Sequence, residues 1–387
     1  MVGKQTYSLS VLKPLEMDNK KISAWADLES RSIEANAFLS PFFILPAIRY
    51  LEAKAKILVL FVERIISGSS DVVGVGVFKI CKPSKHFPLP HLAAFRSIHS
   101  YLSGLLVDKD YAIDVLHIMF NYLSQPGQNW HGIMFEKHSS EGALAELENS
   151  IATEYGMKWS TYRRSYRAIL YPAECGESNL SLLSMNLQRN YRRWIRKLEK
   201  VGEIDWKFAR GDELNDANID QLIKLEDMGW KGKQGTSLNS QPNHALFFRE
   251  MIQGFNQVGR AFFTELYVGG NLIASQSNLI SGNAGFRFKI GWNTAYAEFA
   301  PGMVNEIKGL LGLYQYLDEL EFIDSGSSER AFINRIWLRR RSLHDGIYSK
   351  TKSGKLIAYA IQFALKLKNR LSKKRFLERV QLKLNEK

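Results

Sequence analysis

Apolar and polar residues alternate along the chain with two periods, which predict strands and helices in turn. Runs with a period near two residues and many β-branched side chains predict strands, as in KILVLFVE (56–63) and VVGVGVFKI (72–80). The SGSSD between these runs predicts a β-hairpin. The first half also contains a predicted helix at 24–37, a strand at 100–107, a helix at 110–123, a strand at 129–135, a helix at 142–155 and one or two strands at 159–171.

The second half repeats this order of elements without repeating the residues. Its clearest turn signal is Gly269-Gly270, which predicts a tight hairpin between strands at 260–268 and 271–280. Strands that alternate with helices around a leading hairpin predict an α/β fold with helices flanking a mixed sheet. The other predicted elements are a helix at 184–201, a strand at 204–209, helices at 218–228 and 243–258, a strand at 285–292, a helix at 303–316, a strand at 321–324 and a helix at 331–339.

Length and composition favour two folded domains. The chain has 387 residues, of which 45% are hydrophobic, so each half can bury a core of its own. PAECGES (172–178) has the composition of a linker. We therefore predict an N-terminal domain at 1–172, a C-terminal domain at 178–349 and a helical tail at 350–387.

The net charge of +13 is concentrated in this tail. Residues 350–387 contain 12 of the 52 Lys and Arg residues and two of the 39 acidic residues, which leaves 40 basic and 37 acidic side chains elsewhere. A nearly balanced body argues against DNA or another nucleic acid as its partner. In the tail, one helical face is apolar, so two interpretations stay open: a helix docked on the body, or an anchor on an anionic membrane. The apolar positions are Leu356, Ala360, Phe363, Leu367 and Leu371.

Several classes of protein are excluded by what the sequence lacks. Cys81 and Cys175 form no cluster, and no histidine motif is present, so we expect no disulfide framework and no metal. No nucleophile motif of the Ser/His/Asp or Cys/His kind occurs, which disfavours a covalent acyl-enzyme. The N-terminus lacks the apolar core of a signal peptide, and no apolar run spans a membrane. We expect a cytoplasmic protein, at most peripheral at the inner face of the membrane.

Four stretches of the second half carry a family resemblance. They are SMNLQRNYRRWIRKLEKVG (184–202), LIKLEDMGWKGKQGTSL (222–238), GRAFFTELYVGGNLIASQSNLI (259–280) and FKIGWNTAYAEFAPG (288–302). Their order and their motifs resemble the CelD-like acetyltransferases of the GNAT superfamily, a tandem branch related to Fem-type transferases. The first half is similar through its element order and NAFLSPFF (36–43). The resemblance implies two tandem GNAT-like domains, each with a mixed, mostly antiparallel sheet flanked by helices.

The turn before the helix at 303 is the candidate cofactor site. A helix N-terminus offers unpaired N–H groups and a positive dipole end to an anion. The resemblance implies that this anion is the pyrophosphate of acetyl-CoA or another acyl-CoA, although the usual R/Q-x-x-G-x-G loop is absent and Ala300 replaces a serine. A helix start without a ligand stays the alternative. The cofactor-binding candidates are Ala300, Pro301, Gly302, Met303 and Arg287.

Three charged residues in or after strands are the catalytic candidates. Strict alternation in GFRFKIGW puts Lys289 and Arg287 on one face, as a cleft wall or as a solvated sheet face. Glu265 is the acid of an apolar strand and could accept a proton, or it could pair with a cation. Asp324 ends a strand, where ligands bind in α/β sheets, or it starts an Asx turn.

The candidates for substrate binding lie in a loop and on a helix. Trp230 and Lys231 belong to GWKGK (229–233), which could fold over an acceptor or be a plain connection. Arg193 lies on a basic helix that could contact an anionic substrate or be solvated.

We therefore expect an acyltransferase in which the acceptor attacks the thioester directly through an amine or hydroxyl. The family's association with envelope and polysaccharide pathways implies a small-molecule or glycan-precursor acceptor. Two alternatives stay open: a Fem-like transferase that uses aminoacyl-tRNA, and an interaction protein without catalysis. The sequence does not predict an oligomeric state.

Overall fold

The computed structural model describes residues 6–84 and 87–385, without the side chains of Trp230 and of residues 369–385. The α-helices are α1 (Asn19–Leu28), α2 (Pro41–Tyr50), α3 (Ala112–Ser124), α4 (Ala143–Glu154), α5 (Met185–Glu199), α6 (Asp216–Met228), α7 (Trp230–Lys233), α8 (Pro242–Gln257), α9 (Pro301–Gly312) and α10 (Lys352–Asn385). The strands are β1 (Thr6–Leu12), β2 (Ile57–Ile66), β3 (Ser69–Cys81), β4 (His91–Ala94), β5 (Leu106–Val107), β6 (Gly132–Ser139), β7 (Lys158–Leu170), β8 (Ile204–Arg210), β9 (Ala261–Val268), β10 (Asn271–Ser281), β11 (Ala284–Trp292), β12 (Phe322–Asp324) and β13 (Arg339–Ser349).

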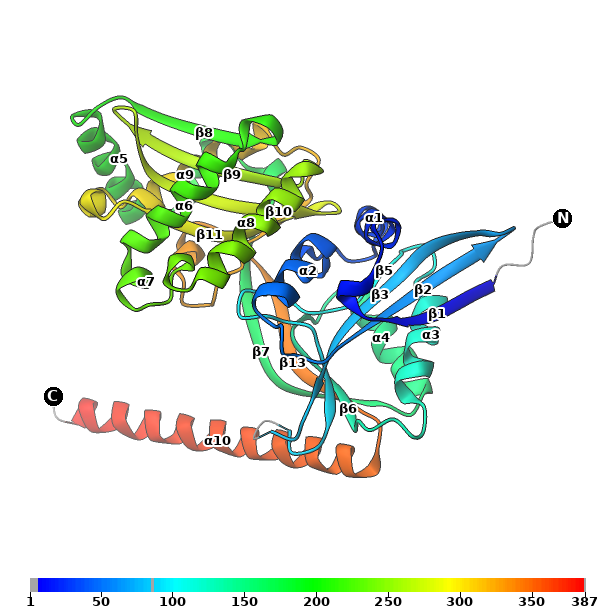
Figure 1. The fold of residues 1–387 in the computed structure, drawn as a ribbon. Coiled ribbons are helices and arrows are strands. Elements are labelled where there is room, and N and C mark those ends of the chain that lie inside the picture. The colour runs from blue at the N-terminus through cyan, green and yellow to red at the C-terminus, as the bar shows by residue number, and fades with distance from the viewer. Residues whose placement is uncertain (1–5, 85–86, 386–387) are drawn as a thin grey trace.

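One 13-stranded sheet runs through both halves in the order β1-β2-β3-β4-β6-β13-β7-β12-β11-β10-β9-β8, with β5 beside β3. Among the described strands, β4–β6 and β11–β12 are parallel and the other pairs are antiparallel. Helices flank the sheet in each half (Figure 1). The predicted fold class, a mixed and mostly antiparallel sheet flanked by helices, is confirmed.

The two halves share their central strands. β13 comes from the end of the second half, yet it lies between β6 and β7 of the first. The far end of β7 in turn pairs with β12, through Ile169 and Leu170. The sheet is continuous across the predicted domain limits at 1–172 and 178–349, and these limits stay a prediction.

The predicted helix at 331–339 is wrong over most of its length. A 3₁₀ turn occupies Phe332–Arg335, and a strand begins at Arg339. Here tertiary contacts override local propensity, because the strand pairs with β6 and β7 and its Arg341 pairs with two acidic residues from other parts of the fold. Arg341 pairs with Asp324 and Glu34.

The first half differs as well, since β1, α2 and β4 were not predicted and two predicted elements are shorter or displaced. The helix predicted at 24–37 coincides with α1 only at 24–28. Helix α1 begins at Asn19, where Asp18 as the N-cap accepts a hydrogen bond from the amide of Lys21, and it ends at Leu28. The strand predicted at 100–107 is confined to β5. In the preceding loop, serine hydroxyl groups form hydrogen bonds with backbone groups in place of the backbone bonds of a strand. Ser100 Oγ accepts from the amide of Ser97, and Ser103 Oγ donates to a carbonyl oxygen of β6.

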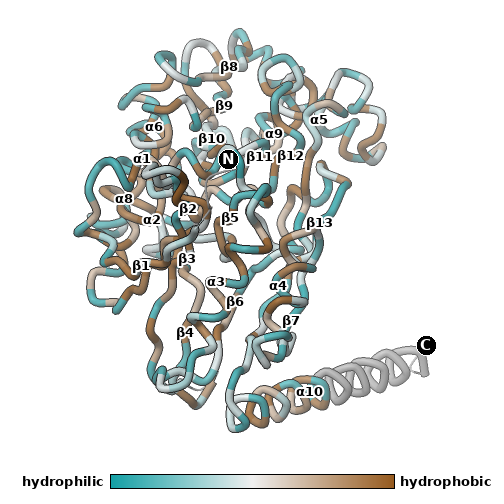
Figure 2. The backbone as a smooth tube through the Cα atoms, turned by 90° about the vertical axis from the view of Figure 1, so that its right-hand side faces the viewer, coloured by the Kyte–Doolittle hydropathy of each residue, from teal (hydrophilic) through white to brown (hydrophobic). Residues whose placement is uncertain are grey.

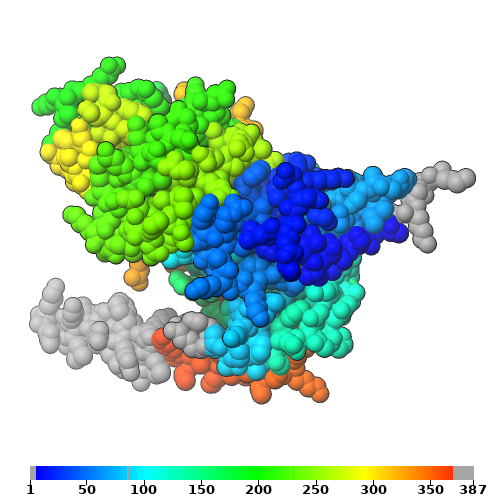
Figure 3. All heavy atoms as spheres, in the orientation of Figure 1, coloured from blue at the N-terminus to red at the C-terminus, as the bar shows by residue number. Residues whose placement is uncertain are grey.

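An aromatic core joins the two halves along α2 and α8. Phe43 of α2 packs edge-on against Phe247 of α8, with ring centroids 5.3 Å apart. Phe38 and Phe288 are buried in the same cluster. In Figure 3 the blue atoms of the first half lie directly against the green atoms of the second. This contact fixes the second half, with its candidate site, on the first.

Candidate functional site

A cavity of about 860 Å³ opens at the carboxyl end of β11. The cause is the short strand β12, which pairs with β11 only at Ala284–Phe286, so that the rest of β11 has no strand on that side among the described residues. Such a splayed parallel pair is where α/β sheets bind ligands. Lining residues come from α5, α6, α7 and α9 as well as from β11. The lining residues are Ser184, Asn186, Leu187, Asn190, Trp194, Leu225, Glu226, Gly229, Lys231, Ile290, Gly291, Trp292, Ala297, Ala300, Pro301, Gly302, Met303, Phe332 and Arg335.

The N-terminus of α9 forms one wall, so the structure brings four of the five predicted cofactor-binding residues, Ala300 to Met303, to the cavity. Ala300 holds the left-handed conformation, φ 48°, and its carbonyl oxygen accepts from the amides of Met303 and Val304. Pro301 has no N–H. The amide of Gly302 is thus the first-turn donor that no protein acceptor uses within the described part of the chain.

Gly302 also leaves room beside its backbone. A Cβ atom there would meet Trp292 and Ile290, both lining residues, at 3.5 and 3.6 Å. These are ordinary van der Waals distances. A ligand can therefore approach the free amide and the positive end of the α9 dipole, the geometry that binds anions. Ala300 supplies no side-chain cap, as its replacement of a serine predicts.

Another wall comes from one face of α5. Asn186, Asn190 and Trp194 recur every four residues and so lie on the same side of the helix. Trp292 adds a second indole. Arg193, the predicted contact on this helix, is exposed and is not among the lining residues. The four-residue spacing of the asparagines could have predicted this lining face. The prediction relied on charge and therefore selected Arg193.

Glu226 contributes a buried carboxylate to the cavity wall. Its side chain is 3% exposed and accepts hydrogen bonds from Lys231 Nζ at 2.5 Å and from the amide of Leu238 at 2.9 Å. Lys231 itself lines the cavity, as predicted for a substrate contact, while the side chain of Trp230 lies outside the described part. The sequence prediction missed Glu226, although LEDMGWKG contains it.

The predicted shared face of Arg287 and Lys289 is wrong. The pairing of β10 with β11 shifts between Ser277 and Asn278, so one residue of β11 bulges and the alternation changes. Arg287 donates to Gln276 and pairs with Glu306 of α9. Burial lowers its pKa to about 9. Arg287 therefore belongs to the interior behind the cavity and does not line it.

Lys289 reaches the other side of the sheet and contacts the first half. Its Nζ donates to Nδ1 of His99 at 3.0 Å, and both side chains are buried. Burial lowers the pKa of Lys289, and burial together with this ammonium lowers the pKa of His99 to about 2. Lys289 is thus a polar contact between the halves and is not among the lining residues.

Glu265 lies within the sheet, away from the cavity. It is 1% exposed and accepts hydrogen bonds from Asn218, Tyr267 and Ser275. Burial and then this carboxylate raise the pKa of Tyr267. The three donors hold Glu265 in place on the α6 side of β9, without access to a ligand in the cavity.

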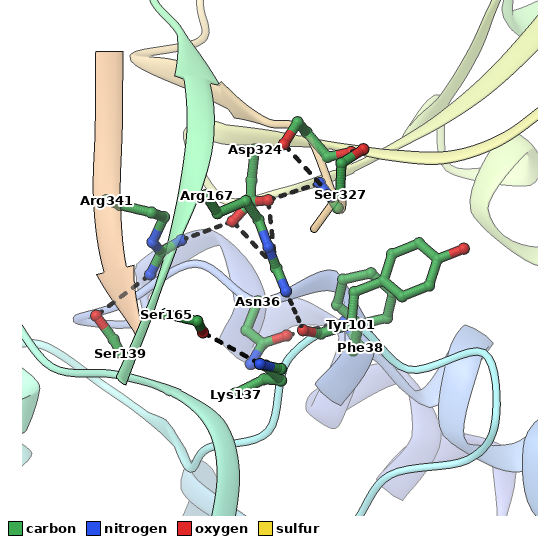
Figure 4. Close-up of polar contacts among 12 residues, drawn as sticks. Asn36, Phe38, Tyr101, Lys137, Ser139, Ser165, Arg167, Asp324, Ser327 and Arg341 are labelled. Carbon is green, nitrogen blue, oxygen red and sulfur yellow. Dashed lines mark hydrogen bonds and ion pairs between the residues drawn. The ribbon is translucent and has the colours of Figure 1, made fainter. Parts of the chain in front are cut away.

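Asp324 holds the central strands together (Figure 4). Its fully buried carboxylate accepts from Arg167 at 3.3 Å, from Arg341 at 3.3 Å and from the amide of Gly326 at 2.8 Å. The bond to Gly326 is the predicted Asx turn. The two arginines come from β7 and β13, so this cluster joins the shared strands and does not border the cavity.

Neither a metal nor a membrane span is evident in residues 6–84 and 87–385. No group of three or more His, Cys, Asp or Glu side chains there could hold a metal ion. No helix in these ranges is both long and apolar enough to cross a bilayer.

Residues 185–306 match the family model of the acetyltransferase (GNAT) domain. All but three of the lining residues (Ser184, Phe332 and Arg335) fall within this GNAT match. No curated protein matches the chain by sequence.

Solved structures resemble the fold over most of the chain. FemX is 9% identical, with a TM-score of 0.56 over 90% of this chain and 100% of its own. The C-terminal domain of a putative lysylphosphatidylglycerol synthetase from Agrobacterium fabrum is 11% identical, with a TM-score of 0.52 over 89% and 96%. A protein of unknown function from Bacteroides thetaiotaomicron is 11% identical, with a TM-score of 0.51 over 89% and 99%. At these identities the similarity concerns the fold.

Proposed function

We propose that the protein is an acyltransferase that binds acyl-CoA, with acetyl-CoA as the first candidate, in the cavity at the N-terminus of α9. The main observation in support is that the free amide of Gly302 and the splayed end of β11 border the same cavity. A volume of about 860 Å³ is within the ordinary range for a cofactor site. The match to the acetyltransferase domain covers this same part of the chain.

The reaction that this arrangement supports is direct transfer. The amine or hydroxyl of the acceptor attacks the thioester carbonyl, a carbon–nitrogen or carbon–oxygen bond forms, the carbon–sulfur bond breaks, and CoA leaves as the thiolate. Glu226 is the one carboxylate among the lining residues and takes the proton of the acceptor. Lys231, hydrogen-bonded to Glu226, supplies positive charge beside it.

For the acceptor we propose a small molecule or a glycan precursor with a free amine or hydroxyl. The support is the resemblance of four stretches to the CelD-like branch. Asn186 and Asn190 are consistent with a polyhydroxylated acceptor, because amide side chains both donate to hydroxyl groups and accept from them.

A second candidate is transfer from aminoacyl-tRNA. The observation that favours it is the fold similarity to FemX and to the lysylphosphatidylglycerol synthetase domain. The balanced charge of residues 1–349 disfavours it, because RNA binding depends on clustered cations.

A donor titration separates the candidates. Calorimetry with acetyl-CoA, with CoA, and with charged and uncharged tRNA is expected to give saturable binding of acetyl-CoA and of CoA, which share the pyrophosphate, and no binding of either tRNA. Binding of charged tRNA without binding of acetyl-CoA would replace the first candidate by the second. If no donor binds at millimolar concentration, the result would favour the third alternative, an interaction protein without catalysis.

A further inference from the structure

The helix α10 has an apolar face that nothing in the described structure covers. Leu356, Tyr359, Phe363 and Leu367 are 69, 63, 60 and 48% exposed. At about 100° per residue they fall within about 80° of one another, so they form one stripe. We call these four residues the α10 stripe. Apolar side chains this exposed are unusual on one face unless they contact a partner.

The same helix is fixed to the body by its opposite face. Ala358 is fully buried, and Ile357 and Ile361 pack with it against a small cluster that includes Met134 and Ile347. Gln362 donates to the carbonyl oxygen of Thr161 on β7 at 3.2 Å. The first turns of α10 are therefore held in one orientation, which presents the α10 stripe outward.

Figure 1 shows α10 leaving the body as a single helix, and Figure 2 shows the coloured start of this helix beneath the first half. The predicted alternatives for the tail, docking and anchoring, thus apply to different faces of one helix. The face that carries Ala358 is docked on the body, as the first alternative predicts. The α10 stripe remains for a partner outside this chain.

The charge around the stripe identifies the chemistry of that partner. Lys352, Lys355 and Lys366 belong to the described stretch of the helix, and the whole segment 350–387 carries 12 basic and two acidic residues. A second copy of this helix would bring like charges together, which is unfavourable. An apolar stripe bordered by lysines is instead complementary to a surface with anionic headgroups above an acyl layer.

We propose that the α10 stripe and its lysines bind the surface of an anionic lipid bilayer. The helix lies in the plane of the interface, with its apolar residues below the headgroups and its ammonium groups among them. The docked face keeps the body of the protein close to the membrane. This binding does not depend on the proposed acyl transfer.

Vesicle co-sedimentation of the full chain tests the proposal. We expect binding to vesicles of equal parts phosphatidylcholine and phosphatidylglycerol, weaker binding to pure phosphatidylcholine, and a decrease with added salt. The double variant Tyr359→Ser/Phe363→Ser should lower the partition coefficient at least about tenfold, because two aromatic side chains no longer enter the bilayer. The matched control Ile98→Ser/Leu338→Ser removes two apolar side chains that are 73 and 58% exposed elsewhere, and it should bind as the wild type does.

Three results would overturn the proposal. They are absence of binding by the wild type, equal losses in the two double variants, and a wild-type dimer in solution that Tyr359→Ser/Phe363→Ser dissociates. The last would assign the stripe to a second copy of the chain. All substituted side chains are exposed, so the variants should retain the melting temperature of the wild type, which serves as the folding control.

Discussion

At the residue scale, the candidate site depends on a few positions where a small or charged side chain has a specific consequence. Gly302 keeps the start of α9 open, and Ala300 holds a left-handed backbone just before it. Glu226 places a carboxylate on the adjacent wall. The predicted catalytic residues Glu265, Lys289 and Asp324 are instead committed to buried hydrogen bonds.

Replacing Glu226→Gln tests its role as the proton acceptor. The amide oxygen of glutamine can still accept from the amide of Leu238, so we expect the fold and acetyl-CoA binding to persist. The rate of CoA thiol release should fall about 10²- to 10⁴-fold, the usual loss for a general base. The control is Asp227→Asn, the neighbouring carboxylate, which bonds Ser237 and does not line the cavity. Equal rates in the two variants would exclude Glu226 as the base.

At the element scale, α6 lies unusually close to β11. A Cβ atom on Gly291 would come within 2.5 Å of the amide nitrogen of Glu226 and 2.8 Å of the carbonyl carbon of Leu225. Backbone atoms cannot move aside as a side chain does. The glycine therefore fixes the distance at which Glu226 faces the cavity.

We expect Gly291→Ala to lower the free energy of unfolding by about 2–3 kcal/mol, as overpacking does. Urea denaturation measures this change. Gly309→Ala, where the new Cβ would meet Leu313 at an ordinary 3.5 Å, should be neutral or stabilising. A Gly291→Ala protein as stable as the wild type would show that α6 is not packed this closely.

The elements also show how far local sequence determines this fold. The hairpins at β2–β3 and β9–β10 were predictable because their turn residues adjoin their strands; Gly269 and Gly270 both have positive φ. Strand β13 was not, because its arginines are stabilised by acids that are distant in the chain. The bulge in β11 likewise depends on its partner strand. The Pro-Gly start of α9 was predictable because its signal is local in the sequence. Glu226 was not, because it comes close to this turn only in the folded chain.

At the scale of the whole molecule, the halves are joined by buried polar contacts as well as by the aromatic core. Glu29 of the first half is fully buried and accepts from Ser281 of β10 at 2.8 Å, with Arg260 at 3.5 Å. Burial raises its pKa from 4.5 to about 7, against the opposing effects of Ser40, Arg260 and Ser281. This contact should therefore make the stability of the molecule depend on pH.

The sign follows from the raised pKa. Between about pH 4.5 and 7 the folded protein binds more protons at Glu29 than the unfolded chain does, so stability falls as the pH rises through this window. The loss is on the order of 3 kcal/mol, at 1.36 kcal/mol per pKa unit. In Glu29→Gln this loss should be absent. In urea denaturation, the free energy of unfolding of the variant should therefore rise relative to that of the wild type between pH 5 and pH 8. The control Glu298→Gln changes an exposed carboxylate. If the free energies of unfolding of Glu29→Gln and the wild type differ by the same amount at pH 5 and at pH 8, the account is contradicted.

The central claim, an acyl-donor site at the start of α9, is tested most directly by titrating acetyl-CoA into three proteins: the wild type, Gly302→Ala and Gly309→Ala. Both substitutions add one methyl group to the same helix at an uncrowded position, but only the first adds it to the cavity. We predict one saturable site in the wild type, an affinity at least about tenfold lower in Gly302→Ala because an anion loses close approach to the amide, and wild-type affinity in Gly309→Ala. Equal affinities in all three proteins, or no binding at all, would contradict the claim.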